Sequence, residues 1–160
     1  MSGITSVIKM NNIVLTLLEE IHNDLWGKEN NVSTQTSRAH RLTREWQNRL
    51  VIIDAERYKA EFISSSQRGK RSHKIDLVDL KERTAYELKV SPNNAHFEFY
   101  KDVFKVLYAN SSEKVIDKLV FCCPSLAEAK LGILAIFVTT LSKQLDLEIE
   151  IHYISQRSKK

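Results

Sequence analysis

The chain has 160 residues, of which 42% are hydrophobic and 28% charged, with only four glycines and two prolines. These values exclude a disordered chain, and the length removes the need for a metal or disulfide staple. The longest apolar stretch, 133–138, is too short to cross a bilayer, so we expect no membrane partner. The first residues predict no secretory signal, and the only cysteines, Cys122 and Cys123, are adjacent, which favours a reduced, cytoplasmic protein.

Positive charge is concentrated in one segment of the chain. The net charge is +4, but the segment from Arg38 to Lys74 holds ten basic and four acidic residues, which leaves the remainder at −2. A concentrated basic segment attracts polyanions, of which nucleic acid is the commonest in a cytoplasm. A solvated basic face without a partner is the alternative.

The first part of the chain predicts two helices. Apolar residues recur every three or four positions over 4–26, which indicates an amphipathic N-terminal helix, and the polar stretch 27–36 predicts a loop. Ser37 can cap a second helix. Its apolar stripe comprises Ala39, Leu42, Trp46, Leu50 and Ile53.

The pattern then changes to that of strands. The segments 58–64, 74–80 and 84–90 predict strands, with a basic loop over 65–72 and a turn near Lys81 and Glu82. Ser91-Pro92-Asn93-Asn94 can open a helix that ends near Asn110. The apolar face that we expect for it comprises Phe97, Tyr100, Phe104, Leu107 and Tyr108.

The last third predicts a strand, a helix and a strand. The strands are 115–123 and 147–154, and Ser125 and Glu128 form a capping box for a helix that ends near Gln144. The residues expected inward on that helix are Leu126, Ile133, Leu134, Phe137 and Leu141. The order α-α-β-β-β-α-β-α-β predicts one α/β domain over 1–160 with a central mixed sheet flanked by helices: an N-terminal helix and linker over 1–36 and a core over 37–154.

Two carboxylates face each other in the predicted hairpin 74–90. A turn between Lys81 and Glu82 pairs residues whose numbers sum to 163, which sets Asp76 opposite Glu87. Because alternate residues share a face, Asp76, Glu87 and Lys89 should project away from a core face. That core face comprises Ile75, Leu77, Tyr86, Leu88 and Val90. The two acids are tolerated if a cation lies between them, either Lys89 or a Mg²⁺ ion held by carboxylates, phosphate and water.

Asp76, ten further residues and then Glu87-Leu88-Lys89 resemble the motif of the PD-(D/E)xK nuclease superfamily, which includes restriction endonucleases and Holliday-junction resolvases. The resemblance covers about 37–153, although Ile75 stands where the motif has proline. It implies a restriction-endonuclease-like core in which Asp76, Glu87 and the Leu88 carbonyl bind Mg²⁺, for which Mn²⁺ substitutes. In this family the lysine, here Lys89, assists the attacking water.

The family often adds a glutamate from the preceding helix, for which Glu45 is our candidate, with Glu56 and Glu61 as runners-up. Acid-x-Lys also occurs at 79–81 and 128–130, but only 87–89 has a paired Asp at hairpin register. A salt-bridged hairpin in an ordinary α/β domain is the alternative to a nuclease site.

We therefore expect a Mg²⁺-dependent DNA endonuclease, type II restriction-like, acting on double-stranded or branched DNA. The N-terminal helix can cap the core or form a dimer interface, and we expect a homodimer because it matches a two-fold duplex. The residues expected to contact nucleic acid are Arg38, Arg41, Arg44, Arg49, Arg68, Lys70, Arg71, His73 and Lys74. The alternatives are a Holliday-junction resolvase, an RNA-processing nuclease of the same fold, and an inactive nucleic-acid-binding subunit.

Overall fold

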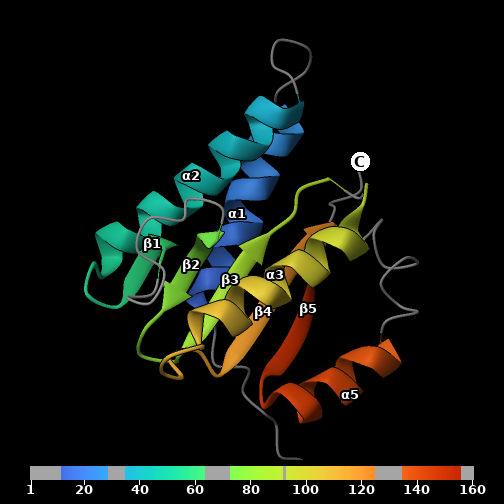
Figure 1. Cartoon of the computed structure of the whole chain (residues 1–160). Helices are drawn as coiled ribbons and strands as arrows, with labels where there is room; N and C mark the ends of the chain where they lie inside the picture. The colour runs from blue at the N-terminus through green and yellow to red at the C-terminus, as the bar shows by residue number, and fades with distance from the viewer. Residues whose placement is uncertain (1–11, 29–34, 64–72, 92, 125–134, 156–160) are drawn as a thin grey trace, which may run out of the picture.

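The computed structural model describes residues 12–28, 35–63, 73–91, 93–124 and 135–155. Within them, helices flank a five-stranded mixed sheet, which confirms the predicted α/β class (Figure 1). The elements in chain order are α1 (Ile13–Lys28), α2 (Gln35–Ile53), β1 (Tyr58–Phe62), β2 (Ile75–Asp79), β3 (Thr84–Leu88), α3 (Ala95–Ala109), β4 (Lys118–Pro124), α5 (Ala135–Leu145) and β5 (Glu148–Ile154).

The sheet combines an antiparallel meander with a parallel part. Its strand order is β1-β2-β3-β4-β5, where β1, β2 and β3 pair antiparallel while β4 and β5 continue parallel to β3. Leu77 pairs with Tyr86 and Asp79 with Thr84, so paired residue numbers in the β2–β3 hairpin sum to 163. The predicted register is confirmed over these pairs, and continued by one residue it sets Asp76 across from Glu87.

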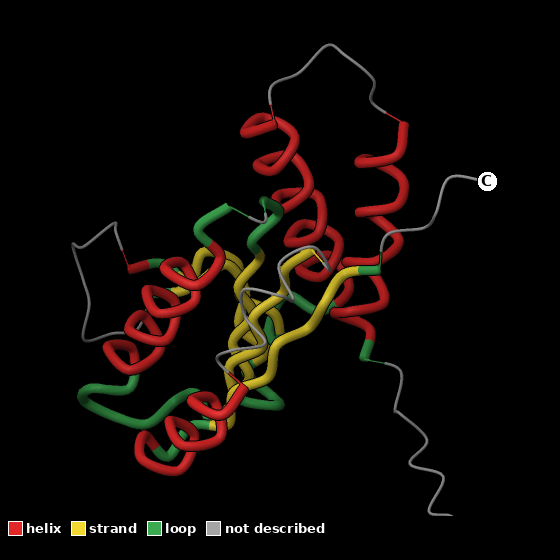
Figure 2. The backbone as a smooth tube through the Cα atoms, turned by 90° about the vertical axis from the view of Figure 1, so that its right-hand side faces the viewer, coloured by secondary structure: helices red, strands yellow, loops and turns green. Residues whose placement is uncertain are grey.

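Helices cover both faces of the sheet (Figure 2). Leu77 and Tyr86 pack beneath α1 and α2, whereas Ile75 packs in the cluster beneath α3 and α5. The expectation that Ile75 shares a core face with Leu77 is therefore wrong. The expectation that Glu87 projects from a non-core face is also wrong, because α3 covers that face and leaves the residue only 3% exposed.

Helix α1 begins after Asn12, and the part of the predicted helix over 4–11 lies outside the described residues. Asn12 is not helical, and its Oδ1 accepts the N–H groups of Val14 at 3.1 Å and Leu15 at 3.4 Å, as an N-cap does. Its Nδ2 donates to the Tyr86 hydroxyl at 3.1 Å, which ties the helix start to β3. Trp46 Nε1 donates to the Val14 carbonyl at 2.9 Å and joins α2 to α1.

The expected apolar face of α3 is wrong. Phe97, Tyr100, Phe104 and Tyr108 are exposed, and only Leu107 packs partly against the core. The buried residues are instead Ala95, Phe99, Asp102, Val103, Lys105, Val106 and Ala109. Both sets have helical spacing, but small residues at 95 and 109 and the β-branched pair at 103 and 106 allow the helix to approach the sheet closely.

Other helix expectations have mixed outcomes. On α2, Leu42, Trp46 and Leu50 are fully buried as predicted, whereas Ile53, at the last turn, is exposed. On α5, Leu141 packs against the core as predicted. The capping box and the inward positions 126, 133 and 134 lie outside the described residues, as does the Phe137 side chain. None of the helices described has both the length and the apolar character needed to cross a membrane.

Asp79 anchors the turn end of the meander. Its carboxylate accepts two hydrogen bonds from Arg57, Nε to Oδ1 at 2.9 Å and Nη2 to Oδ2 at 2.8 Å. Oδ1 also accepts the N–H groups of Lys81 and Glu82 at 3.0 and 3.1 Å. This carboxylate therefore links the residue that precedes β1, the end of β2 and the turn to β3 in a bidentate arrangement.

Asp79→Ala is expected to lower the free energy of unfolding by about 3 kcal/mol, because it leaves Arg57 and two turn N–H groups without their buried acceptor. Urea denaturation followed by circular dichroism measures this loss. The matched control is Asp117→Ala, which removes the exposed ion pair with Arg83 and should lower the free energy of unfolding far less, because water screens this pair. Equal losses in the two variants would show that Asp79 is not an anchor.

Candidate active site

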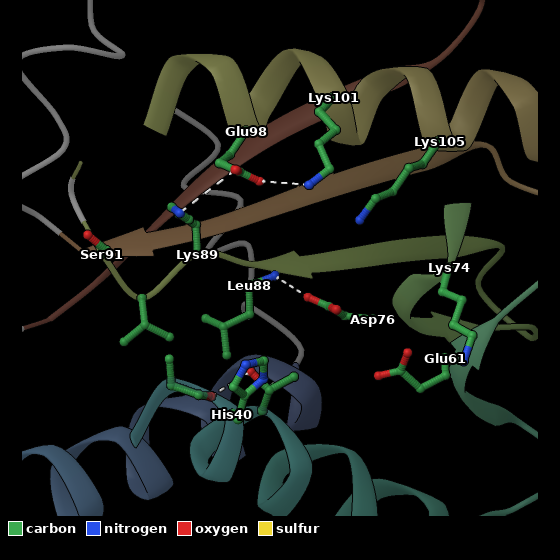
Figure 3. A pocket seen from close by; sticks show the side chains of 13 residues that line it. His40, Glu61, Lys74, Asp76, Leu88, Lys89, Ser91, Glu98, Lys101 and Lys105 are labelled. Atoms are coloured by element: carbon green, nitrogen blue, oxygen red, sulfur yellow. Dashed lines mark hydrogen bonds and ion pairs between the residues drawn. The ribbon is translucent and has the colours of Figure 1, made fainter. Parts of the chain in front are cut away.

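A cleft of about 730 Å³ opens between α2 and α3, where β2 begins and β3 ends (Figure 3). Asp76, Leu88 and Lys89 all line it, so the structure brings together three of the positions that the motif indicated. The other lining residues are Ala39, His40, Thr43, Glu61, Lys74, Val90, Ser91, Glu98, Lys101 and Lys105. Four of the lining residues are lysines and three are acids, which suits a polyanionic ligand.

Asp76 lines the cleft and is held by two hydrogen bonds. Its Oδ2 accepts the N–H of Leu88 at 2.9 Å, and its own carbonyl accepts Gln47 Nε2 at 2.6 Å. Burial raises the pKa of Asp76, the Leu88 N–H opposes that shift, and the nearby Glu61 carboxylate adds to it. A cation beside Asp76 would relieve the cost of its charge.

A third carboxylate lies at the same level of the sheet. Paired residue numbers between β1 and β2 sum to 137, so Glu61 lies beside Asp76 on one side. The β2–β3 register places Glu87 beside Asp76 on the other side. Glu61 has a positive φ of 50°, and its Oε1 accepts Gln47 Nε2 at 3.2 Å. The register thus aligns acidic residues across three adjacent strands.

Glu87 lies behind the cleft wall rather than in it. Its Oε1 accepts Lys105 Nζ at 3.1 Å, and the same ammonium lies 3.1 Å from Asp102 Oδ1. Burial raises the pKa of Glu87 well above its ordinary value, and the charges of Asp76 and Asp102 add to the shift. We name Glu87, Lys105 and Asp102 the buried ion cluster.

The buried ion cluster contains two residues that sequence reasoning missed. Lys105 and Asp102 lie three residues apart on the face of α3 that packs against the sheet. The aromatic residues of α3 predicted a different buried face, so neither residue was among the candidate site residues. The paired spacing of Asp102 and Lys105 was the available signal.

Lys89 lines the cleft but turns toward α3 (Figure 3). Its Nζ lies 4.0 Å from Glu98 Oε1, and the two side chains form a long ion pair. The cation in contact with Glu87 is therefore Lys105, not Lys89.

The structure does not bring Glu45 to the acids. Its Oε1 accepts Arg49 Nε at 2.8 Å on the surface of α2, and it is not among the described residues that line the cleft. The face of α2 toward the cleft carries Ala39, His40 and Thr43, with Gln47 one turn further on. Of the two runners-up, Glu61 lines the cleft and Glu56 does not.

The expected nucleic-acid contacts are dispersed. Lys74 lines the cleft, and the His73 ring lies 5.0 Å from that of Tyr108 on α3. Arg41 and Arg44 are exposed on α2, Arg38 is half-buried, and Arg49 pairs with Glu45. Arg68, Lys70 and Arg71 lie outside the described residues.

The oxygen donors at the cleft fit a hard divalent cation that keeps water and phosphate ligands. Across the described ranges, no group of three or more His, Cys, Asp or Glu residues is arranged as a complete metal cage. Mg²⁺ needs only one or two carboxylates when substrate phosphates supply the rest. Asp76 and Glu61 bring carboxylates to the cleft, and Leu88, whose carbonyl the motif implicates, lines it as well.

No family model, curated protein or solved structure gives a significant match to this chain.

Asp102 makes stability depend on pH. Burial raises the pKa of Asp102 to about 6, although Lys105 opposes the shift and Asp76 and Glu98 add to it. Because the folded pKa lies above the ordinary value of 3.8, the unfolded chain loses this proton first, and stability falls as the pH rises from about 4 to about 6. We expect the Asp102→Asn variant to lose less stability than the wild type over this interval. Urea denaturation at a series of pH values measures the difference, and parallel curves would contradict it.

Proposed function

We propose that the protein is a Mg²⁺-dependent DNA endonuclease with a restriction-endonuclease-like core. The observation that carries the proposal is the convergence of Asp76, Leu88 and Lys89 in one lysine-lined cleft. The observed order α2-β1-β2-β3-α3-β4 supports it, because the resemblance to the superfamily includes this order of helices and strands as well as the motif.

Asp76 and the Leu88 carbonyl would hold the cation, with Glu61 next to them. The bound Mg²⁺ or Mn²⁺ would polarise the phosphoryl oxygen and lower the pKa of a water molecule. Lys74 and Lys101 offer ammonium groups to the phosphates on either side of the scissile bond. Lys89 is held by a long ion pair with Glu98, so a phosphate can draw it toward the reaction centre.

The buried ion cluster has a positioning role in this proposal. Lys105 holds the Glu87 carboxylate against β3 from the side of α3. The Leu88 N–H orients Asp76, so the peptide segment between Glu87 and Lys89 supports the metal-binding acid directly. Preorganised groups of this kind act without reorganising during the reaction.

The three classes of nuclease within this proposal differ in their substrates. Type II restriction-like cleavage of double-stranded DNA by a homodimer predicts discrete fragments from a long duplex. A Holliday-junction resolvase would prefer a four-way junction, and an RNA-processing nuclease would cleave RNA. Comparing these substrates separates the three activities.

A second candidate function is an inactive nucleic-acid-binding subunit. One observation favours it: Glu87, Asp102 and Lys105 satisfy one another, and Lys89 faces Glu98. In that case the acids have a structural role, and binding is salt-sensitive but independent of metal.

Nicking of supercoiled plasmid in Mg²⁺ tests the proposed activity. Asp76→Asn and Lys89→Met are expected to lower the rate by about 10²-fold or more, since each removes a charge that acts at the reaction centre. Asp117→Asn is the matched control, because this exposed acid pairs with Arg83 at the other end of the strands, and its rate should stay unchanged. Metal-independent binding by the wild type without any cleavage would favour the second candidate.

A further inference from the structure

Four aromatic side chains line the outer face of α3. Phe97 is 65%, Tyr100 40%, Phe104 72% and Tyr108 37% exposed. They recur every three or four residues and therefore form one continuous line, which we name the aromatic stripe. Such a concentration of exposed rings on a helix marks an interaction surface.

The aromatic stripe borders the cleft. Lys101 and Lys105 line the cleft from the same helix (Figure 3). Each lysine lies three or four residues from a member of the stripe, which makes them neighbours on the helix surface. Glu98 lies 3.4 Å from Lys101 and 4.0 Å from Lys89, and such solvent-accessible pairs are weak, so phosphate oxygens can replace the carboxylate. One helix thus presents ring faces on its outer side and ammonium groups toward the cleft.

Ring contacts hold both ends of the stripe. The Phe97 ring lies 4.2 Å from that of His96, and the Tyr108 ring lies 5.0 Å from that of His73. His73 precedes the cleft residue Lys74, so the stripe also meets the cleft at the start of β2. Rings held in this way lose little conformational freedom when a planar ligand stacks on them.

We propose that the aromatic stripe stacks on unpaired bases of DNA whose phosphate backbone follows the lysines of the cleft. This inference rests on the proposed nuclease function and names its substrate class: DNA with a single-stranded or branched segment rather than continuous duplex. Cationic grooves beside exposed rings are the means by which proteins bind single strands. A continuous duplex keeps its base faces stacked inside the helix and offers the rings no such contact.

A second copy of the chain fits the stripe less well. In a two-fold interface the same patch meets itself, so the lysines beside the stripe on one copy would approach those on the other. DNA brings the opposite charge to this surface. Charge complementarity therefore favours the nucleic acid.

The test is fluorescence anisotropy in EDTA with three labelled probes: a single strand, a forked duplex and a blunt duplex of the same sequence. The Phe97→Leu/Phe104→Leu variant keeps apolar side chains but removes two flat rings. We expect its Kd to rise at least fivefold per ring, about 25-fold in total, for the single strand and the fork. The Kd for the blunt duplex should change less than about twofold.

Ile52→Ala is the matched control, because Ile52 is an 84% exposed apolar residue on α2, and it should leave all three Kd values unchanged. Phe104→Tyr keeps a ring and should bind as the wild type does. Equal melting temperatures will show that the variants are folded, which is expected for changes at exposed positions.

An unchanged Kd for the single strand and the fork would overturn the inference, as would an equal loss on all three probes. Sedimentation gives a further outcome that would overturn it: the wild type is a dimer, the double variant is a monomer, and their DNA affinities are equal. That result would assign the stripe to self-association. Because binding is measured without metal, this result is independent of the nicking assay. Ring-dependent binding without cleavage would refute only the nuclease proposal, and cleavage without ring dependence only this one.

Discussion

The contact of Lys105 with Glu87 and Asp102 determines how α3 lies on the sheet. Three charges in a covered layer are stable only when their partners stay in register, because any rotation of the helix would leave a buried charge without its counterion. This constraint turns Ala95, Phe99 and Val106 toward the strands and the aromatic stripe toward solvent. It also places Lys101 along the wall of the cleft. The cleft and the exposed rings thus both follow from one ion cluster.

Gln47 has a comparable role on the opposite face of the sheet. Its side-chain amide reaches both Glu61 Oε1 and the Asp76 carbonyl, so α2 is fastened to β1 and β2 next to the cleft. An amide can make these two contacts without adding another negative charge to a region that already holds three carboxylates. A glutamate at the same position would oppose Glu61 and Asp76 unless a cation were bound.

The predictable features were those determined by local rules. Turn geometry gave the register of β2 and β3, and therefore the juxtaposition of Asp76 and Glu87, because side chains in a hairpin alternate with a fixed period. Helix orientation was harder to predict: α3 carries two apolar faces with the same spacing, and the choice between them depends on close packing against the sheet and on the contact of Lys105 with Glu87, which the sequence of the helix alone does not specify. Glu45 and Gln47 differ by only two positions on α2, yet that difference moves a side chain from the cleft side to solvent.

The strand order has a consequence for how the domain assembles. The strands β1, β2 and β3 follow one another in the order of the described elements, whereas the parallel strands β4 and β5 are reached through α3 and α5. Contacts between segments close in sequence form with a smaller loss of chain entropy, so the meander has the advantage in the early steps of folding. Glu61, Asp76 and Glu87 all belong to that early unit, which means that the acids come together before Lys105 arrives to neutralise one of them. Divalent cations in the refolding buffer would then speed the collapse of the nascent meander even if the finished protein bound them weakly.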